Sequence, residues 1–426
     1  MGATCCAMPS RWVTEHWAVR PGALDPDAVL AAPPRGAFTL LHGEGRFVVL
    51  AEEPLAHLGA ADLADLHWER TGEAPPIRPD LLGFVTYEHG YGLDSTLPAP
   101  PFVQDPLPDL RFTVHRRLSV FDRTTGLLHE AERNLPAELE PAPHDLGHGA
   151  FAARKKADTD TAAGYAAKVA RIREAIAAGS VYQVNLTRQE AWTVQGSLAE
   201  LARRLHGLNP APFSALVADP AFTLLSSSPE CFLRWDQGRI LTRPIKGTAP
   251  RHADPRQDET LARELLASAK NRSELAMIVD LLRNDLARLC VLPSVGVAGF
   301  PMLESYANVH HLVAEIAGAL AGPPRLEAML KALFPGGSVT GCPKLAAMGL
   351  IRELEAEPRR IYCGALGWMA HDLSEGAWAL PIRTAWAWDG QLRFGVGGGV
   401  VWDSDPAAEY EETVHKGRSL VACLRS

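Results

Sequence analysis

Short apolar runs, separated by glycine, proline and aspartate, recur in the first third of the chain. Examples are "FTLLHGEGRFVVLAEEP" (38–54), "LLGFVTYEHGYG" (81–92) and "LRFTVHRRLSVFD" (110–122). Runs of this length with such punctuation predict strands joined by turns. The stretch "AELEPAPHDLGHGAFAARKKADTDT" contains few large apolar residues and predicts a surface connection. We therefore expect a strand-rich N-terminal region over 1–136, a connection over 137–160 and a second region over 161–426.

The second region begins with a helical pattern and continues as a mixture of strands and helices. In "TAAGYAAKVARIREAIAAGS", Thr161 or Asp160 can cap the N-terminus of the helix, and Gly179 marks its end. Strand patterns follow, among them "VYQVNLTRQEAW", "FTLLSSSPECFLRW" and "GRILTRPIKGT". Because strands and helices do not alternate regularly, the order favours a mixed α/β sandwich over a doubly wound parallel sheet. We expect the two regions to pack together as one unit.

Composition argues against several classes of function. The 426 residues carry a formal net charge of −8, which disfavours a nucleic-acid partner because phosphate binding needs a basic surface. No apolar stretch approaches the roughly 20 residues that span a bilayer, so we expect no membrane partner. The seven cysteines show no CxxC spacing and predict neither a zinc site nor a disulfide framework. We expect a protein of the reducing cytoplasm.

Two glycine-rich stretches resemble nucleotide-binding loops but lack the required spacing. "FPGGSVTGCPK" has Cys-Pro-Lys after Gly341, where a phosphate-binding loop needs Gly-Lys-Ser/Thr. "GVGGGV" has Val400 where a dinucleotide-binding turn needs its third glycine. The bare amides of Gly397 and Gly399 can instead receive a carboxylate, because glycine lets a ligand approach the main chain closely. A bulge or a crossing of strands explains the same glycines equally well.

Acidic side chains recur at helical spacing near the C-terminus. Glu409, Glu412 and Lys416 fall at i, i+3 and i+7, so one face of a predicted helix carries two acids and then a base. Upstream, Glu274 lies at the edge of the apolar stripe of a second predicted helix, "SELAMIVDLLRNDLARLC". Three glutamates from two helices suit Mg²⁺, which prefers oxygen ligands. The alternative is two solvated helix faces with an ordinary ion pair between Glu412 and Lys416.

A series of motifs occurs in the order seen in chorismate-utilising enzymes, and the chain resembles that family. They are YQVNLTR, SSSPECFL, RPIKGTAPR, MIVDLLRNDLARLC, FPGGSVTGCPKLAAM, YCGALGW, PIRTAWA and GGGVVWDSDPAAEYEETVHK. The likeness covers residues 160–426 strongly and the N-terminal region weakly. It implies an α/β (α+β) fold of two large, mostly antiparallel sheets, packed as a sandwich with helices on the outside. It also implies that residues 161–426 form a chorismate-binding catalytic region.

Two positions distinguish the branches of this family. Members that add water at ring carbon C2 of chorismate carry a lysine base where this chain has Gln183, and an amide cannot take a proton from water. Anthranilate synthases carry alanine where this chain has Lys246. The resemblance is therefore closest to the branch of aminodeoxychorismate synthase component I, in which this lysine is proposed as a covalent nucleophile. The alternatives are anthranilate synthase component I, of tryptophan biosynthesis, and a non-catalytic regulatory protein that binds chorismate or tryptophan.

The resemblance implies a role for each matching residue. Lys246 would attack C2 of chorismate, Glu230 would protonate the departing C4 hydroxyl, and ammonia would then attack C4 and expel the lysine. The product would be 4-amino-4-deoxychorismate, a precursor of 4-aminobenzoate and folate. Arg383 would bind the enolpyruvyl carboxylate. The remaining implied residues are His311 and Ser338, which orient the ring and the hydroxyl; Tyr362, Thr248, Gln183, Lys416, Gly397 and Gly399, which bind substrate; and Glu274, Glu409 and Glu412, which hold Mg²⁺.

Ammonia needs a source, and no stretch of the sequence has the features of a glutaminase. A separate glutamine amidotransferase subunit is therefore the implied partner.

Some positions depart from the family pattern. Asn271 stands where many relatives carry an acid, and the span from Tyr362 to Arg383 is one residue longer than usual, which predicts a bulge in that hairpin.

Overall fold

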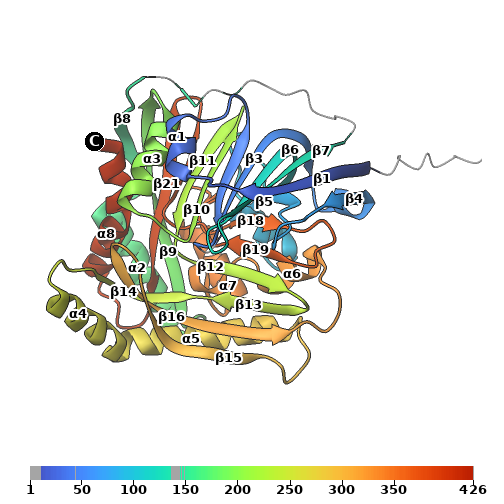
Figure 1. The fold of residues 1–426 in the computed structure, drawn as a ribbon. Coiled ribbons are helices and arrows are strands. Elements are labelled where there is room, and N and C mark those ends of the chain that lie inside the picture. The colour runs from blue at the N-terminus through green and yellow to red at the C-terminus, as the bar shows by residue number, and fades with distance from the viewer. Residues whose placement is uncertain (1–10, 44, 136–143, 145, 148, 426) are drawn as a thin grey trace, which may run out of the picture.

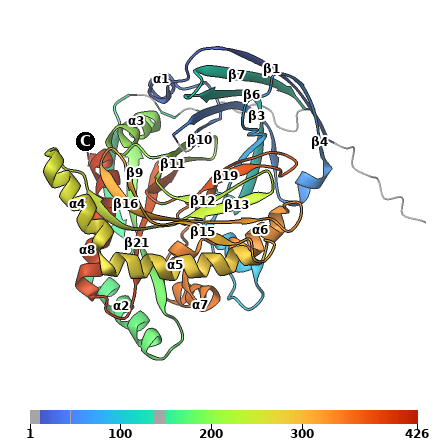
Figure 2. The same ribbon diagram turned by 60° about the horizontal axis from the view of Figure 1, so that its bottom comes forward.

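The computed structural model describes residues 11–43, 45–135, 144, 146–147 and 149–425. Strands occupy the centre of the described chain, and helices lie on its periphery (Figure 1, Figure 2). The apolar runs near the N-terminus form strands as predicted, except that the run over 81–92 is a strand only to Val85 and continues as a 3₁₀ helix from Tyr87. The N-terminal strands are β1 (Arg11–Pro21), β2 (Phe38–Gly43), β3 (Phe47–Leu58), β4 (Leu66–Gly72), β5 (Leu81–Val85), β6 (Leu110–Asp122) and β7 (Leu127–Asn134).

Strands and helices mix in the second region without regular alternation. The strands are β8 (Ala152–Asp158), β9 (Gln183–Gln195), β10 (Phe213–Asp219), β11 (Phe222–Ser228), β12 (Cys231–Asp236), β13 (Arg239–Arg243), β14 (Ile245–Pro250), β15 (Gly296–Ser305), β16 (Val309–Ala319), β17 (Gly341–Cys342), β18 (Ala365–Met369), β19 (Gly376–Ala379), β20 (Thr384–Trp388) and β21 (Gln391–Val400). The α-helices of the whole described chain are α1 (Pro26–Ala31), α2 (Ala162–Ala177), α3 (Leu198–Leu208), α4 (Pro255–Ala267), α5 (Ala269–Ala287), α6 (Leu326–Leu333), α7 (Lys344–Leu354) and α8 (Pro406–Arg425). Three 3₁₀ helices are η1 (Ala61–Asp65), η2 (Tyr87–Leu93) and η3 (Gly337–Val339).

The named strands pair antiparallel, apart from β1 with β4. One limb of the sheet runs β9–β21–β20–β11–β10–β2–β3–β6, and the other runs β6–β5–β18–β19–β12–β13–β16. The long strand β6 pairs with β3 on one edge and with β5 and β7 on the other. The mixed α/β fold is confirmed, and β6 joins the two halves into one continuous hydrogen-bonded network.

The helices cover the outer faces of this network. Helix α2 begins and ends where the sequence predicts, since the Thr161 side chain accepts a hydrogen bond from the Gly164 amide and Gly179 has a φ of 74°. Helices α2 and α8 pack against each other and against β9 and β21, and α5 packs against β14, β15 and β16. The apolar stripe of α5 is buried, as its period of i, i+3, i+4 and i+7 requires. Both acid-bearing helices therefore lie against the sheet.

The predicted connection over 137–160 contains a strand that composition did not reveal. Within it, residues 137–143, 145 and 148 lie outside the described residues. Residues Ala152–Asp158 form β8, which pairs with β9 at the edge of the sheet. Most side chains of the "AARKKAD" segment are exposed, so its composition is polar and shows no strand pattern. Its backbone hydrogen bonds to β9 define it as a strand.

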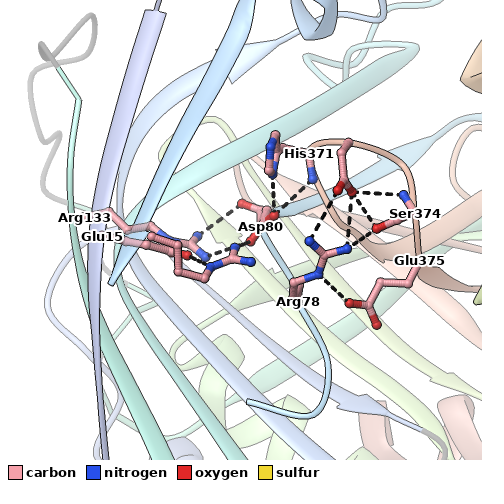
Figure 3. Close-up of polar contacts among 9 residues, drawn as sticks. Glu15, Arg78, Asp80, Arg133, His371, Ser374 and Glu375 are labelled. Atoms are coloured by element: carbon pink, nitrogen blue, oxygen red, sulfur yellow. Dashed lines mark hydrogen bonds and ion pairs between the residues drawn. The ribbon is translucent and has the colours of Figure 1, made fainter. Parts of the chain in front are cut away.

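A buried ionic network ties the N-terminal strands to the β18–β19 hairpin (Figure 3). The fully buried Arg133 of β7 donates from Nε to Glu15 of β1 at 2.8 Å and from Nη1 to the Asp80 carbonyl at 3.1 Å. In the hairpin turn, His371 Nδ1 lies 2.8 Å from Asp80 Oδ2, and the His371 amide donates to the same oxygen at 3.1 Å. The network anchors the tip of a hairpin whose two ends lead to Tyr362 and Arg383.

Candidate active site

The glycine-rich strand β21 forms a regular ladder with β9. Gly397 lies opposite Thr187 and Gly399 lies opposite Asn185, with no shift of register between Gln391 and Val400. The bulge that would also explain the glycines is therefore absent from this ladder. Side chains on cross-strand partners point to the same face, and glycine has none, so β21 presents a bare floor beside the β9 side chains.

Both ends of this floor are bounded by predicted site residues. A methyl group added at Gly399 would lie 2.9 Å from Gln183 Nε2 and 3.2 Å from Lys246 Nζ. At the other end, a methyl group on Gly395 would lie 2.5 Å from the Tyr362 ring, which is buried. The floor therefore runs between the amine of Lys246 and the ring of Tyr362.

Lys246 lies on β14 beside Gly247, at an irregularity in the strand pairing that only glycine fits well. Gly247 has a φ of 82°, and a methyl group there would lie 2.9 Å from Cγ of Asn271. Burial, then repulsion from the Lys416 ammonium, lowers the pKa of Lys246, although nearby carboxylates oppose this change. The lysine ammonium therefore releases its proton more readily than an exposed lysine does. The side chain of Asn271 on α5 packs against Gly247.

Glu230 and Ser338 form a buried acid and hydroxyl pair. Glu230 follows β11 and Ser338 lies in η3, and the Ser338 hydroxyl donates to Glu230 Oε1 at 2.6 Å. Both side chains are buried. Burial raises the pKa of Glu230 to about 7, although the Ser338 hydrogen bond and the Lys246 cation act to lower it. A carboxyl group in this state can hold a proton near neutral pH, as a general acid must.

Thr248, His311 and Arg383 form a second group around the lysine strand. His311 of β16 is buried, and its Nδ1 lies 3.2 Å from the Thr248 hydroxyl. Burial, followed by repulsion from the Arg383 cation, lowers the pKa of His311 to about 3, so its imidazole is neutral at neutral pH. The His311 Nε2 atom has no hydrogen-bond partner among the described residues. It is therefore available to a ligand.

The acids of α8 meet the opposite face of the same glycine strand. A methyl group at Gly398 would lie 3.3 Å from an oxygen of Glu409 and 3.3 Å from one of Glu412. Lys416 Nζ lies 2.6 Å from Glu412 Oε1 and donates to the Gly397 carbonyl at 2.9 Å. Glu409 is buried and accepts from Ser404 at 2.6 Å, and burial raises its pKa. The C-terminal helix therefore brings two acids and a base against the face of β21 opposite the floor.

Two of the three predicted metal ligands, Glu409 and Glu412, lie beside the same strand residue, Gly398. Glu409 Oε2 is buried without a partner among the described residues, and its neighbour Glu412 supplies a second oxygen. Glu274 of α5 lies near enough to Lys246 to act to raise the pKa of that lysine. The Lys270 ammonium lies 3.9 Å from the Glu274 carboxylate. No three acidic, histidine or cysteine side chains of the described chain meet at metal-ligand distances. A pair of carboxylates still fits Mg²⁺, which commonly keeps several waters.

The structure adds two side chains that the sequence reasoning missed. Asn185 and Thr187 follow Gln183 at every second position of β9, and all three are buried. Thr187 Oγ1, Asn185 Nδ2 and both polar atoms of the Gln183 amide have no partner among the described residues. Unpaired buried polar atoms are costly, so a row of them beside the glycine floor indicates a ligand surface. The alternation of polar residues in "YQVNLTR" was the available signal.

A separate cavity lies behind the lysine strand. Its volume is about 570 Å³, and its walls include Phe213, Arg243, Ile245 and Tyr306. Ile245 is among the residues that line this cavity, and Lys246, which follows it on β14, is not. The sequence reasoning did not predict the cavity.

These groups place a lysine amine of lowered pKa, a buried carboxyl group of raised pKa and a row of unpaired polar side chains around a bare peptide floor. The sequence model of a protein family described as "chorismate binding enzyme" matches residues 26–422, and the chain belongs to that family. The family resemblance predicted from the motifs is thus confirmed. None of the described helices is long and apolar enough to cross a membrane.

The chain is similar to curated relatives of two kinds. It is 42% identical over 262 residues to aminodeoxychorismate synthase component 1 of Klebsiella aerogenes, a match that covers 62% of this chain and 58% of that protein. It is 36% identical over 363 residues to the Escherichia coli protein of the same name, covering 84% of this chain and 79% of the relative. It is also 35% identical over 380 residues to anthranilate synthase component 1 of Streptomyces coelicolor, covering 82% and 74%.

Solved structures share the fold at lower identity. The menaquinone-specific isochorismate synthase of Escherichia coli superposes with a TM-score of 0.77 at 18% identity, over 98% of this chain and 96% of that chain. Anthranilate synthase component I of Streptococcus pneumoniae superposes with a TM-score of 0.70 at 24% identity, over 98% and 94%. The fold is therefore common to members that perform different reactions, and side chains at the site must distinguish them.

Proposed function

We propose that this chain is an aminodeoxychorismate synthase component I, which converts chorismate and ammonia to 4-amino-4-deoxychorismate. The observation that carries the proposal is the position of Lys246. Its amine adjoins Gln183 and the bare face of Gly399, and burial lowers its pKa. A lysine in this state suits nucleophilic attack, whereas the amide of Gln183 cannot activate water as a base.

The first half of the proposed reaction replaces a hydroxyl by the lysine. The free amine of Lys246 attacks ring carbon C2, the ring double bonds shift, and the bond between C4 and its hydroxyl breaks. Glu230 supplies the proton that turns this hydroxyl into water, a role supported by its burial and its pKa of about 7. Ser338 holds the Glu230 carboxyl in place with a hydrogen bond of 2.6 Å.

The second half returns the lysine and adds nitrogen at C4. Ammonia attacks C4, the double bonds shift back, and the bond between C2 and Lys246 breaks. The lysine nitrogen leaves as an amine, and the Glu230 carboxylate takes the proton released from the new ammonium group. The sum of the two halves is chorismate plus ammonia giving 4-amino-4-deoxychorismate plus water. A glutamine amidotransferase subunit is the proposed source of ammonia.

Substrate binding in this proposal uses charged groups around the glycine floor. Arg383 binds the enolpyruvyl carboxylate, and Tyr362 and Thr248 contact the same substrate. Glu409 and Glu412, with Glu274 contributing directly or through water, would hold Mg²⁺, whose chemistry when bound would be to supply positive charge to a carboxylate of the substrate. Two neighbouring carboxylate oxygens, one of them unpaired, support this placement.

The test is to identify the product and the covalent intermediate. The purified chain is incubated with chorismate, ammonium and Mg²⁺, and products are identified by mass spectrometry. Intact mass after exposure to chorismate without ammonia should reveal an adduct in the wild type and none in Lys246→Ala. Lys331→Ala, which changes an exposed lysine of α6, is the matched control. Full turnover by Lys246→Ala would exclude covalent catalysis by this lysine.

Anthranilate synthase activity is the second candidate, because anthranilate synthases are among the similar proteins. Its product is fluorescent, so the same incubation distinguishes the two. Anthranilate in place of 4-amino-4-deoxychorismate would establish this alternative. Binding of chorismate without any consumption would establish a regulatory protein.

A further inference from the structure

Asn209 lies between the end of α3 and the segment that carries Arg383. Its backbone amide closes α3 by donating to the Leu205 carbonyl at 2.9 Å, and its side chain is buried. Asn209 Oδ1 accepts a hydrogen bond from Arg383 Nη1 at 3.3 Å. The two residues are 174 positions apart in the sequence, so the contact depends entirely on the fold.

Ser227 determines which way the Asn209 amide faces. The Ser227 hydroxyl donates to the Asn209 carbonyl, so it can only accept from the Asn209 side chain. Asn209 Nδ2 supplies that hydrogen bond at 2.8 Å. The Oδ1 atom must therefore point the other way, toward Arg383. A backbone bond of 3.1 Å from the Ser227 amide to the Arg383 carbonyl holds the two segments together.

Arg383 carries a charge that no acid in the described chain neutralises. Arg359 and Arg133, which are also buried, each form an ion pair with a glutamate. Arg383 makes no ion pair with a described residue, and Asn209 is its side-chain hydrogen-bond partner there. Burial lowers the pKa of Arg383, and the guanidinium still remains charged at neutral pH. A partly buried, uncompensated cation of this kind is suited to an anionic ligand.

We propose that Asn209 is a positioning residue that orients Arg383 while leaving its charge free for a carboxylate of the substrate. The neutral amide oxygen takes one N–H of the guanidinium, and the other N–H groups stay available for a carboxylate. An acid at this position would bind the guanidinium itself and compete with the ligand. The inference rests on the proposed function for the identity of that ligand, chorismate.

The test compares two substitutions whose order depends on charge. Chorismate affinity is measured by calorimetric titration with Mg²⁺ and without ammonia, together with the thermal midpoint, on wild type, Asn209→Asp and Asn209→Ala. Asn209→Asp should weaken chorismate binding by about tenfold to a hundredfold, because charge-assisted hydrogen bonds are lost. Its thermal midpoint should not fall, since an ion pair is gained. Asn209→Ala should weaken binding by only about threefold to tenfold.

A purely structural role predicts the reverse order. Aspartate has nearly the shape of asparagine, so it should then disturb the protein less than alanine does. Chorismate binding by Asn209→Asp that is as tight as that of Asn209→Ala, or tighter, would overturn the inference and leave the proposed function standing. Ser227→Ala, which releases the amide without adding charge, should fall between wild type and Asn209→Ala. A wild-type protein that binds no chorismate would overturn both proposals, whereas one that binds it and makes anthranilate would leave the inference in place.

Discussion

Replacing Glu230 by glutamine measures how strongly the site opposes ionisation of its acid. Burial raises the pKa of Glu230 to about 7, whereas a glutamate in an unfolded chain has a pKa of about 4.3. Between these two values the folded protein binds more protons than the unfolded chain does. The free energy of unfolding therefore falls as the pH rises through this window, and it falls no further above the folded-state pKa.

The size of this loss follows from the two pKa values. Each pKa unit corresponds to about 1.36 kcal/mol, so charging Glu230 costs the folded state about 3 to 4 kcal/mol. Glutamine does not titrate and escapes this loss. We therefore compare the unfolding free energy of Glu230→Gln with that of the wild type at each pH. Between about pH 4.5 and pH 7.5, this difference should increase by about 3 to 4 kcal/mol in favour of the variant. Any constant cost of burying the amide cancels in this comparison.

Urea denaturation followed by tryptophan fluorescence at several pH values provides the assay. Glu264→Gln, which changes an exposed glutamate of α4, is the control and should run parallel to the wild type. Repeating the comparison in a Lys246→Met background separates the effect of burial from that of the neighbouring amine. Parallel curves for Glu230→Gln and the wild type would refute the reasoning, because they would mean that Glu230 ionises at its ordinary pKa.

Three further predictions concern the floor, the lysine turn and the metal. Gly247→Ala should lower the unfolding free energy by about 1 to 3 kcal/mol, because its φ is 82° and a methyl group would lie 2.9 Å from Asn271; an unchanged denaturation midpoint would contradict this. Gly399→Ala should weaken chorismate binding more than about tenfold. Its stability should change little, since the new methyl group meets only the ends of two flexible side chains. An unchanged affinity in calorimetry would show that the substrate binds elsewhere. EDTA should abolish turnover, and Glu412→Gln should raise the Mg²⁺ concentration that restores it; turnover indifferent to EDTA would exclude the metal.

Local patterns were sufficient to predict many of the elements. The caps at Thr161 and Gly179 bound α2 as expected, and the apolar stripe of α5 is buried. Strand β8 escaped prediction because its side chains are mostly exposed, and only its pairing with β9 defines it. Periodicity reports which face of an element is buried, so an element stabilised by backbone pairing alone leaves little signal.

The candidate site could be predicted in its residue types and only partly in its geometry. The motifs selected Lys246, Glu230 and the glycines of β21, and the structure places Lys246 and Gln183 beside the same glycine, Gly399. Among the described residues no three acidic, histidine or cysteine side chains lie close enough together to hold a metal ion, so the three predicted glutamates do not form one cluster there. Helical spacing places acids on one face, but it does not set the distance between two helices.

By itself, the sequence determined the family, many of the helices and strands, and the chemical groups available for a reaction on a small anion, whereas the register between β21 and β9 came from the tertiary structure. The tertiary structure alone decided that Ser338 meets Glu230 across 108 positions and that Asn209 meets Arg383 across 174. It also decided the ionisation of the site. The pKa of a side chain depends on its desolvation and on charges brought close by folding, and neither quantity is written in the local order of residues.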